Sequence, residues 1–480
     1  MASRTAASAA SSARRGLAAY RSLKFVYCRP APAGPATYRR GAGPAGEHDP
    51  YDPHGGAPVA TPDVQAPATA AVPPRVERPP RPLTGPRRLL ADLGPQYVAN
   101  GLIGLVFAAT GPVAVILAVG VQGGLSEREL ASWLFGVFFL NGILTALACW
   151  LYRQPLAFFW TIPGTVLVGP ALAHLTFPQV VGAYFATGLL MLLLGLSGWV
   201  RRAMAAVPMP IVMAMVAGVF LSFGTGLVRS VAGDVLVAAP MVAVFLLLTA
   251  WGAAGRKVPP ILGALAVGVV AVAVSGRFHP RGGASGWLAA PVLVAPQWSW
   301  QAMVELVLPL AITVLVVQNG QGVAVLRTAG HEPPVNVVTI ACGAWSLLTA
   351  GVGAVSTCLT GPTNALLTAS GERHRHYVAG ISCGLLAMVF GLFAPLFTRL
   401  MLAAPPAFVA TLGGLAMLRV LQSAFVTAFG SRCTFGALVT FVVTVSDVTV
   451  LNIGGAFWGL LAGFGVTWLL ERGDLREARG

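Results

Sequence analysis

Charged side chains are scarce in this chain of 480 residues. Asp, Glu, Lys and Arg make up 10% of the sequence and hydrophobic residues 56%, and the mean hydropathy is +0.75. A soluble domain carries about 25% charged residues, so this composition excludes a soluble globular protein. Apolar stretches long enough to cross a bilayer recur from residue 96 to about residue 470. The sequence therefore predicts an all-α integral membrane protein.

Motifs for enzymatic chemistry are also lacking. The six cysteines form no close pair, which argues against a disulfide framework or a metal site and favours small apolar packing residues. The chain has no P-loop, no His/Glu metal motif and no Gly-x-Ser-x-Gly turn. We therefore expect neither an enzyme nor an ATP-driven pump, and we expect no cofactor.

Basic residues exceed acidic ones and give a formal net charge of +15. They lie in an N-terminal tail and in the connections between apolar stretches, and no basic stripe with interleaved aromatic residues is present. Nucleic acid is therefore not an expected partner. Attraction to membrane lipid head groups and the orientation of the chain in the membrane explain the basic residues better.

Residues 1–88 are rich in Ala, Pro, Arg, Ser and Gly and show no hydrophobic periodicity. Such a segment buries too little apolar surface to offset the entropy of ordering, so we predict a disordered basic tail. The Arg/Ser/Ala bias of the first 45 residues is also typical of an organellar transit peptide. We favour a low-complexity cytoplasmic tail or a start codon placed too early. The transmembrane domain is predicted over 89–472, and 473–480 form a short cytoplasmic tail.

Fourteen apolar segments follow one another in the transmembrane domain. With the N-terminus inside, most basic residues of the connections fall on the cytoplasmic side, as the positive-inside rule requires. We therefore place both termini in the cytoplasm and the protein in the inner (plasma) membrane. The segments are 96–118, 130–151, 160–175, 178–199, 208–228, 235–252, 258–275, 301–319, 335–352, 355–368, 378–398, 405–428, 434–447 and 451–470.

Matching glycine and proline positions relate the two halves of the domain. The third segment contains the sequence from Thr161 to Thr165 and the tenth the sequence from Leu359 to Asn364, and both are short and broken by Gly and Pro. Because each half has seven segments, the halves lie in the membrane with opposite orientations. The sequence thus predicts a 7+7 inverted repeat, about 95–276 and 300–471, an architecture common in secondary transporters.

The two broken segments are the candidate binding site. A helix that starts near the midplane presents backbone N–H groups and a positive dipole end, which suits an anion. The alternative is that Gly and Pro only allow kinks and close helix packing. The substrate-binding candidates in these segments are Pro163, Gly164, Thr165, Thr360, Gly361, Thr363 and Asn364.

Amides and carboxylates at membrane depth supply further candidates. Gln318 and Asn319 stand together in the eighth segment, and their side chains can hold a carboxylate without a fixed charge or can join helices. Glu305 and Asp447 are the candidates for carrying a coupling proton, although both also fit interfacial positions. His174 falls at a segment end and is expected to be a loop residue.

Several ordered motifs between about residue 95 and 470 resemble the benzoate/proton symporter (BenE) family. They are Trp160-Thr-Ile-Pro163-Gly164, Gly195-Leu-Ser-Gly-Trp199, Val207-Pro208-Met-Pro210, Met215-Val-Ala-Gly218, Leu308-Pro309-Leu310, Gln318-Asn319 with Gly322-Val-Ala-Val-Leu326, and Gly454-Gly-Ala-Phe-Trp458-Gly459.

The resemblance implies the fourteen-span fold shared with uracil/proton and related nucleobase symporters. In that fold spans 1–4 and 8–11 form a core domain that carries the substrate, and spans 5–7 and 12–14 form a gate domain. Spans three and ten are half-helices beside the substrate, so Pro163, Gly164, Gln318, Asn319 and the segment from Thr360 to Asn364 would line the pocket.

The resemblance also implies the activity, which is proton-coupled symport of benzoate or a similar aromatic carboxylate, with Phe159 and Trp160 beside the ring. The expected partners are that organic anion and a proton, and a homodimer stays open. Nucleobase symporters usually carry carboxylates on spans eight and ten, where this chain has Gln318 and neutral residues. A nucleobase or inorganic-anion transporter on the same fold, or a channel, remains the alternative.

Overall fold

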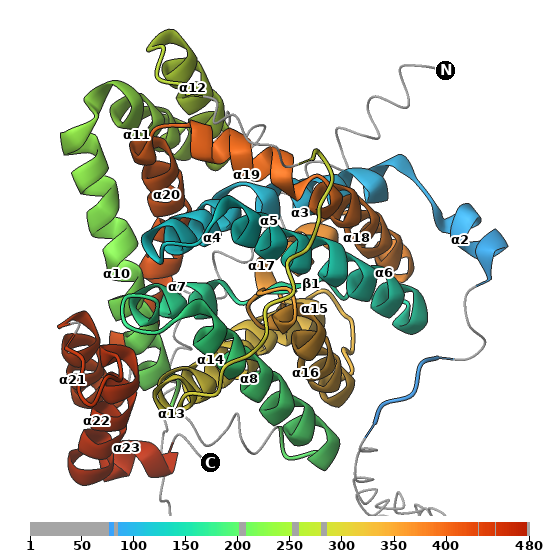
Figure 1. The fold of residues 1–480 in the computed structure, drawn as a ribbon. Coiled ribbons are helices and arrows are strands. Elements are labelled where there is room, and N and C mark those ends of the chain that lie inside the picture. Colours follow the sequence, from blue (N-terminus) through green and yellow to red (C-terminus); the bar gives the residue numbers. More distant parts are fainter. Residues whose placement is uncertain are drawn as a thin grey trace, which may run out of the picture.

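The computed structural model describes residues 76–80, 85–200, 208–251, 259–279, 286–430, 432–446 and 448–477. Most of the predicted N-terminal tail and Asp447 lie outside this part of the chain. The described residues form a helical molecule with one two-stranded sheet at its centre (Figure 1). This agrees with the predicted all-α membrane fold, apart from the two short strands.

The first half of the domain consists mainly of apolar helices, some of them kinked, and of one broken span formed by a short strand and a half-helix. Its elements are α2 (Pro86–Asp92), α3 (Pro95–Ala109), α4 (Gly111–Gln122), α5 (Glu127–Phe135), η1 (Gly136–Leu140), α6 (Asn141–Tyr152), β1 (Phe158–Trp160), α7 (Ile162–Ala171), α8 (Phe177–Ser197), α10 (Met209–Gly233), α11 (Val235–Ala250) and α12 (Pro260–Val274).

The second half repeats this order with additional short helices, among them η4, α19 and α23. Its elements are α13 (Trp300–Ala302), η2 (Met303–Val307), α14 (Leu308–Ile312), η3 (Thr313–Asn319), α15 (Gly320–Thr328), α16 (Val335–Ala350), β2 (Thr357–Leu359), α17 (Gly361–Leu367), η4 (Arg373–Arg375), α18 (His376–Leu392), α19 (Ala394–Ala403), α20 (Pro406–Phe429), α21 (Thr434–Val445), α22 (Gly455–Leu470) and α23 (Arg472–Glu477).

Seven helices of the described residues are long and apolar enough to cross a membrane. They are Pro95–Gln122, Glu127–Tyr152, Phe177–Ser197, Met209–Gly233, Trp300–Thr328, Arg373–Leu392 and Pro406–Phe429. Seven shorter apolar helices of 10–17 residues accompany them. The fold class is confirmed, whereas the number of fourteen crossings stays a prediction.

Helix packing shows the inverted repeat directly. Helix α8 packs against α16, and α18 packs against α6, so the fourth span of each half contacts the second span of the other. Close backbone approach explains both contacts. A Cβ atom on Gly142 would lie 2.6 Å from Gly384 O, and one on Gly343 would lie 2.9 Å from Gly188 O. Small residues therefore let helices meet closely at equivalent places in both halves.

The helices divide into the two predicted groups. Helices α10, α11, α12, α20, α21 and α22 pack on one another and form the gate domain at one side of Figure 1, and the remaining spans form the core domain. Contacts between the groups run from α4 to α20, from α7 to α10 and from η2 to α22.

The described part of the N-terminal segment rests on the core domain. The Glu77 carboxylate accepts hydrogen bonds from the backbone N–H groups of Asn336 (3.2 Å) and Val337 (3.1 Å) at the start of α16. The Tyr152 hydroxyl donates to Glu77 O at 2.9 Å. A carboxylate at a helix N-terminus is favoured by the helix dipole. Contact with the transmembrane domain thus begins upstream of residue 89, the predicted boundary.

Candidate substrate site

The two broken spans meet at the centre of the core domain. Strands β1 and β2 pair antiparallel, with Phe158 opposite Leu359 and Trp160 opposite Thr357. Backbone hydrogen bonds from Thr161 N to Ser356 O and from Thr360 N to Ala157 O, both 3.1 Å, extend the ladder. The strands thereby satisfy each other's polar backbone groups, as non-helical backbone at membrane depth requires. The breaks predicted from Gly and Pro are confirmed.

The two half-helices begin beside each other but are capped differently. At the start of α7 the Thr161 hydroxyl accepts a hydrogen bond from Gly164 N at 3.1 Å. At the start of α17 the equivalent residue, Thr360, makes no side-chain capping bond, and its buried Oγ1 has no partner among the described residues. The backbone N–H groups in the first turn of α17 therefore lack the side-chain cap that Thr161 provides at α7.

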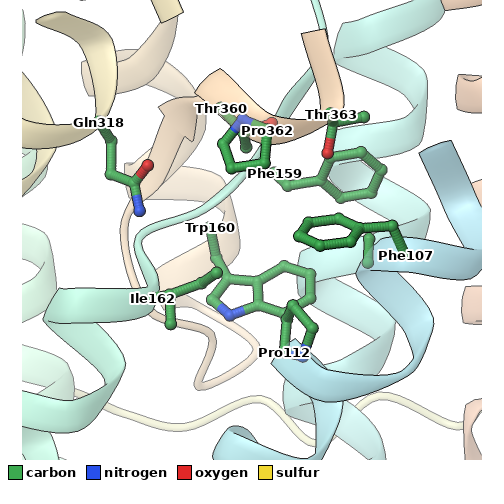
Figure 2. Close-up of a pocket in the computed structure, with 10 residues that line it drawn as sticks. Phe107, Pro112, Phe159, Trp160, Ile162, Gln318, Thr360, Pro362 and Thr363 are labelled. Carbon is green, nitrogen blue, oxygen red and sulfur yellow. The ribbon is translucent and has the colours of Figure 1, made fainter. Parts of the chain in front are cut away.

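A pocket opens at this crossing (Figure 2). Its empty space of about 300 Å³ includes open solvent at the mouth, so the enclosed part of the pocket is smaller. Its walls are mainly aromatic and apolar, and none of its lining residues carries a charge. The lining residues are Phe107, Ala108, Pro112, Phe159, Trp160, Ile162, Gln318, Thr360, Pro362 and Thr363.

Three polar groups of the pocket wall have no partner among the described residues. The indole N–H of Trp160 and the hydroxyl of Thr360 are buried without a hydrogen bond. The side chain of Gln318, which is 6% exposed, points toward the pocket in Figure 2 and forms no hydrogen bond with described residues. For the fully buried Trp160 N–H and Thr360 hydroxyl, the missing hydrogen bond costs about 1–3 kcal/mol each. A ligand with hydrogen-bond acceptors would remove that cost.

Two predicted amides hold the backbone of the site and do not line the pocket. Asn319 Oδ1 accepts a hydrogen bond from Leu359 N at 2.8 Å. Asn364 Oδ1 accepts from Ala157 N at 2.9 Å, and its Nδ2 donates to Thr360 O at 2.6 Å. Asn319 therefore hydrogen-bonds span eight to the second broken span, Asn364 hydrogen-bonds the two broken spans to each other, and neither is among the residues that line the pocket.

The remaining predicted residues divide in the same way. Gln318, Thr360 and Thr363 line the pocket. Thr165 donates to Thr161 O at 3.0 Å within α7. Pro163, Gly164 and Gly361 lie in the first turns of the half-helices, where glycine allows close approach to Thr161 and to Gln321. These residues position the half-helices and do not line the pocket themselves.

Sequence reasoning missed the contribution of span one. Phe107, Ala108 and Pro112 line the pocket where α3 gives way to α4. The internal repeat carries a signal for this position. Aligning the sequence Val113–Ile116 with Val323–Leu326 places Ala108 opposite Gln318, so residues of both equivalent spans face one site.

A buried contact between a histidine and a glutamate lies apart from the pocket, beyond the C-terminal end of α7. His174 Nε2 and Glu305 Oε2 are 2.8 Å apart, and their side chains are 16% and 6% exposed. His174 was expected to be a loop residue, and it lies in the turn after α7. The structure also brings it into contact with Glu305, the candidate proton carrier, which is 131 positions away.

A protein-family model described as benzoate membrane transport protein matches residues 91–469. The chain belongs to this family. The benzoate membrane transport protein of Acinetobacter baylyi is 28% identical over 370 residues, which cover 76% of this chain and 92% of that protein. The inner membrane protein YdcO of Escherichia coli (strain K12) is 27% identical over 388 residues, covering 78% and 95%.

Solved structures support the fold. The transmembrane domain of a cyanobacterium bicarbonate transporter, BicA, matches with a TM-score of 0.52 at 17% identity, covering 81% of this chain and 99% of that one. At this identity the likeness shows the fold alone. Family and fold together make the protein a multi-pass membrane transporter and not an enzyme, which confirms the predicted family and class.

Proposed function

We propose that this family member imports benzoate or a similar aromatic carboxylate together with a proton across the inner (plasma) membrane, with both termini in the cytoplasm. The observation that carries this proposal is the composition of the pocket. Aromatic side chains form its walls, and three unpaired hydrogen-bonding groups stand among them without any charged side chain. Both features suit an aromatic ring that bears a carboxylate better than they suit a small hydrophilic inorganic ion.

The carboxylate end would be bound by neutral donors. An ionised carboxylate only accepts hydrogen bonds, and Gln318 Nε2 and the Thr360 hydroxyl are able to donate from one side of the pocket (Figure 2). Gln318 approaches from span eight and Thr360 from the start of α17, so the anion would be held between two spans of the core domain. Asn319 and Asn364 would act indirectly by keeping both strands in register.

The ring would lie against Phe107, Phe159 and Trp160. Aromatic pairs prefer offset or edge-to-face contact and contribute about 0.5–1.5 kcal/mol beyond burial. Trp160 and Phe159 already stand edge-on to each other, with ring centroids 6.0 Å apart and an interplanar angle of 80°. A non-aromatic anion of the same charge would make no ring contacts with these side chains, so acetate should bind more weakly than benzoate.

Uptake into proteoliposomes tests this proposal. Radiolabelled benzoate should accumulate under an imposed inward proton gradient, and a protonophore should abolish the accumulation. Because benzoic acid itself permeates lipid, protein-free liposomes run alongside, and counterflow of benzoate at equal pH isolates the carrier. Thr360→Val removes one donor with little change in shape and should lower counterflow at least tenfold.

Thr249→Val is the matched control for Thr360→Val. Thr249 is exposed on gate helix α11, and its hydroxyl bonds only Phe245 O within that helix, so transport should be unchanged. Wild-type counterflow no greater than in protein-free liposomes would refute the benzoate assignment. Competition by uracil or sulfate would indicate the nucleobase or inorganic-anion alternative, and flux that never concentrates substrate would indicate a channel.

A further inference from the structure

The His174–Glu305 pair joins three parts of the fold. His174 belongs to the turn that follows α7, where Leu175 N bonds Ala171 O at 2.8 Å and ends the half-helix. Glu305 lies in η2, near the start of span eight, and is 5% exposed. The pair therefore links the broken span that forms the substrate site to the span that carries Gln318.

The second oxygen of Glu305 lies against the gate domain. A Cβ atom on Gly454 would be 2.5 Å from Glu305 Oε1, so the carboxylate sits where this glycine leaves space. Gly454 is the N-cap residue of α22, a helix of 16 residues. The N-terminus of such a helix carries a partial positive charge that favours an anion. The carboxylate is thus held between a core-domain histidine and the N-terminus of a gate-domain helix.

The helices packed against η2 present no charged side chain to Glu305 among their described residues. The elements packed against η2 are α7, α8, α13, α14 and α22. Within their described residues they contain no Asp, Glu, Lys, Arg or His, and the only titratable side chain they contribute is Tyr184 of α8. His174 is the titratable group that the structure places against the Glu305 carboxylate.

We propose that Glu305 is the site of the transported proton and that His174 positions it, so that the contact between core and gate domains depends on protonation. This inference rests on the proposed proton-coupled transport. The carboxylate takes up one proton and becomes a neutral carboxylic acid. It then loses its attraction to His174 and to the N-terminus of α22, and the core domain is released from the gate domain at this end.

Two transport modes separate this role from a structural one. Glu305→Gln keeps the size of the side chain but fixes it in a neutral form. It should therefore abolish concentrative uptake driven by a proton gradient, while counterflow of benzoate, which needs no net proton movement, stays within about twofold of wild type. His174→Gln should retain concentrative uptake and shift its pH optimum. Glu305→Asp, which keeps a titratable group, should restore part of the concentrative uptake.

Glu127→Gln is the matched control. Glu127 also forms an ion pair, with Arg399 at 2.8 Å, but connects α5 to α19 within the core domain, and its replacement should leave both transport modes unchanged. Proton-driven accumulation by Glu305→Gln would overturn the inference. Loss of counterflow together with accumulation in folded Glu305→Gln would also overturn it, because Glu305 would then serve substrate binding or folding.

A measurement without substrate distinguishes failure of this inference from failure of the proposed function. The difference in thermal unfolding midpoint between wild type and Glu305→Gln should change between pH 8 and pH 5, because only wild type can take up a proton at position 305. The difference between wild type and Glu127→Gln should stay constant. A pH-independent difference for Glu305→Gln overturns the inference, whereas absent counterflow in wild type counts against the benzoate assignment alone.

Discussion

Gln318 and Asn364 are both amides at the crossing of the broken spans, and their surroundings predict opposite effects of the same substitution. Gln318 reaches the pocket without a hydrogen bond to described residues. Asn364 is fully buried and bonds the backbone of both broken spans, at Ala157 and Thr360. Replacing each by Leu keeps a similar volume and removes only the amide.

Gln318→Leu should weaken binding and leave stability unchanged. A hydrogen bond to a charged group contributes about 1.5–3 kcal/mol, and each 1.4 kcal/mol corresponds to a tenfold change in affinity, so benzoate affinity should fall roughly 10- to 150-fold. No hydrogen bond within the protein is lost, because Gln318 makes none with described residues. The unfolding midpoint should therefore stay at the wild-type value.

Asn364→Leu should reduce stability first. It leaves the buried Ala157 N–H without a partner, at about 1–3 kcal/mol, and removes a second hydrogen bond of about 1 kcal/mol, for a total of roughly 2–4 kcal/mol. Because the bond to Ala157 fixes the entry into β1, the pocket should loosen as well. A substantial drop in the unfolding midpoint is the expected result.

Both effects are measurable on detergent-purified protein. Benzoate binding is followed by the fluorescence of Trp160, with a Trp160→Phe variant to identify its signal, and stability by thermal unfolding. The reasoning is refuted if Gln318→Leu unfolds earlier with unchanged affinity. It is equally refuted if Asn364→Leu keeps wild-type stability and loses affinity alone, since the asparagine would then be a ligand group.

Three further substitutions test helix packing, the contact of the N-terminal segment and a buried histidine. Gly343→Ala should prevent stable folding, because the new Cβ would collide with the backbone of Leu192, whereas Gly465→Ala, with open space around it, should be neutral in yield and unfolding midpoint. Glu77→Ala should lower the free energy of unfolding by about 1 kcal/mol, since it removes the carboxylate at the N-terminus of α16, and a midpoint equal to wild type would contradict this cap. Burial, aided by neighbouring positive groups, lowers the pKa of His331 from 6.5 to about 4, so this residue's contribution to stability is complete above pH 6.5 and is lost as the pH falls toward 4. His331→Gln should flatten the stability profile in that window, and an unchanged profile would show that the acid sensitivity arises elsewhere.

The sequence by itself determined the class of the protein and the position of its two broken spans. Low charge and recurring apolar stretches require a membrane protein, because such a chain cannot cover a water-facing surface. Gly and Pro at matching positions of both halves predicted the two breaks that the paired strands confirm. These properties depend on composition and on local backbone chemistry, and both can be read directly from the amino-acid sequence.

Only the tertiary structure decided which neighbouring residue faces the pocket and which distant residues meet. Gln318 and Asn319 are the last residues of the π-helical segment η3. A π-helix has hydrogen bonds between residues five positions apart, so the periodicity of an α-helix does not predict which of the two amides faces the pocket. Glu305 and His174 are 131 positions apart, and no local pattern connects them. Their contact depends on how two inverted halves pack, because a pairing across such a distance is set by the whole arrangement of helices.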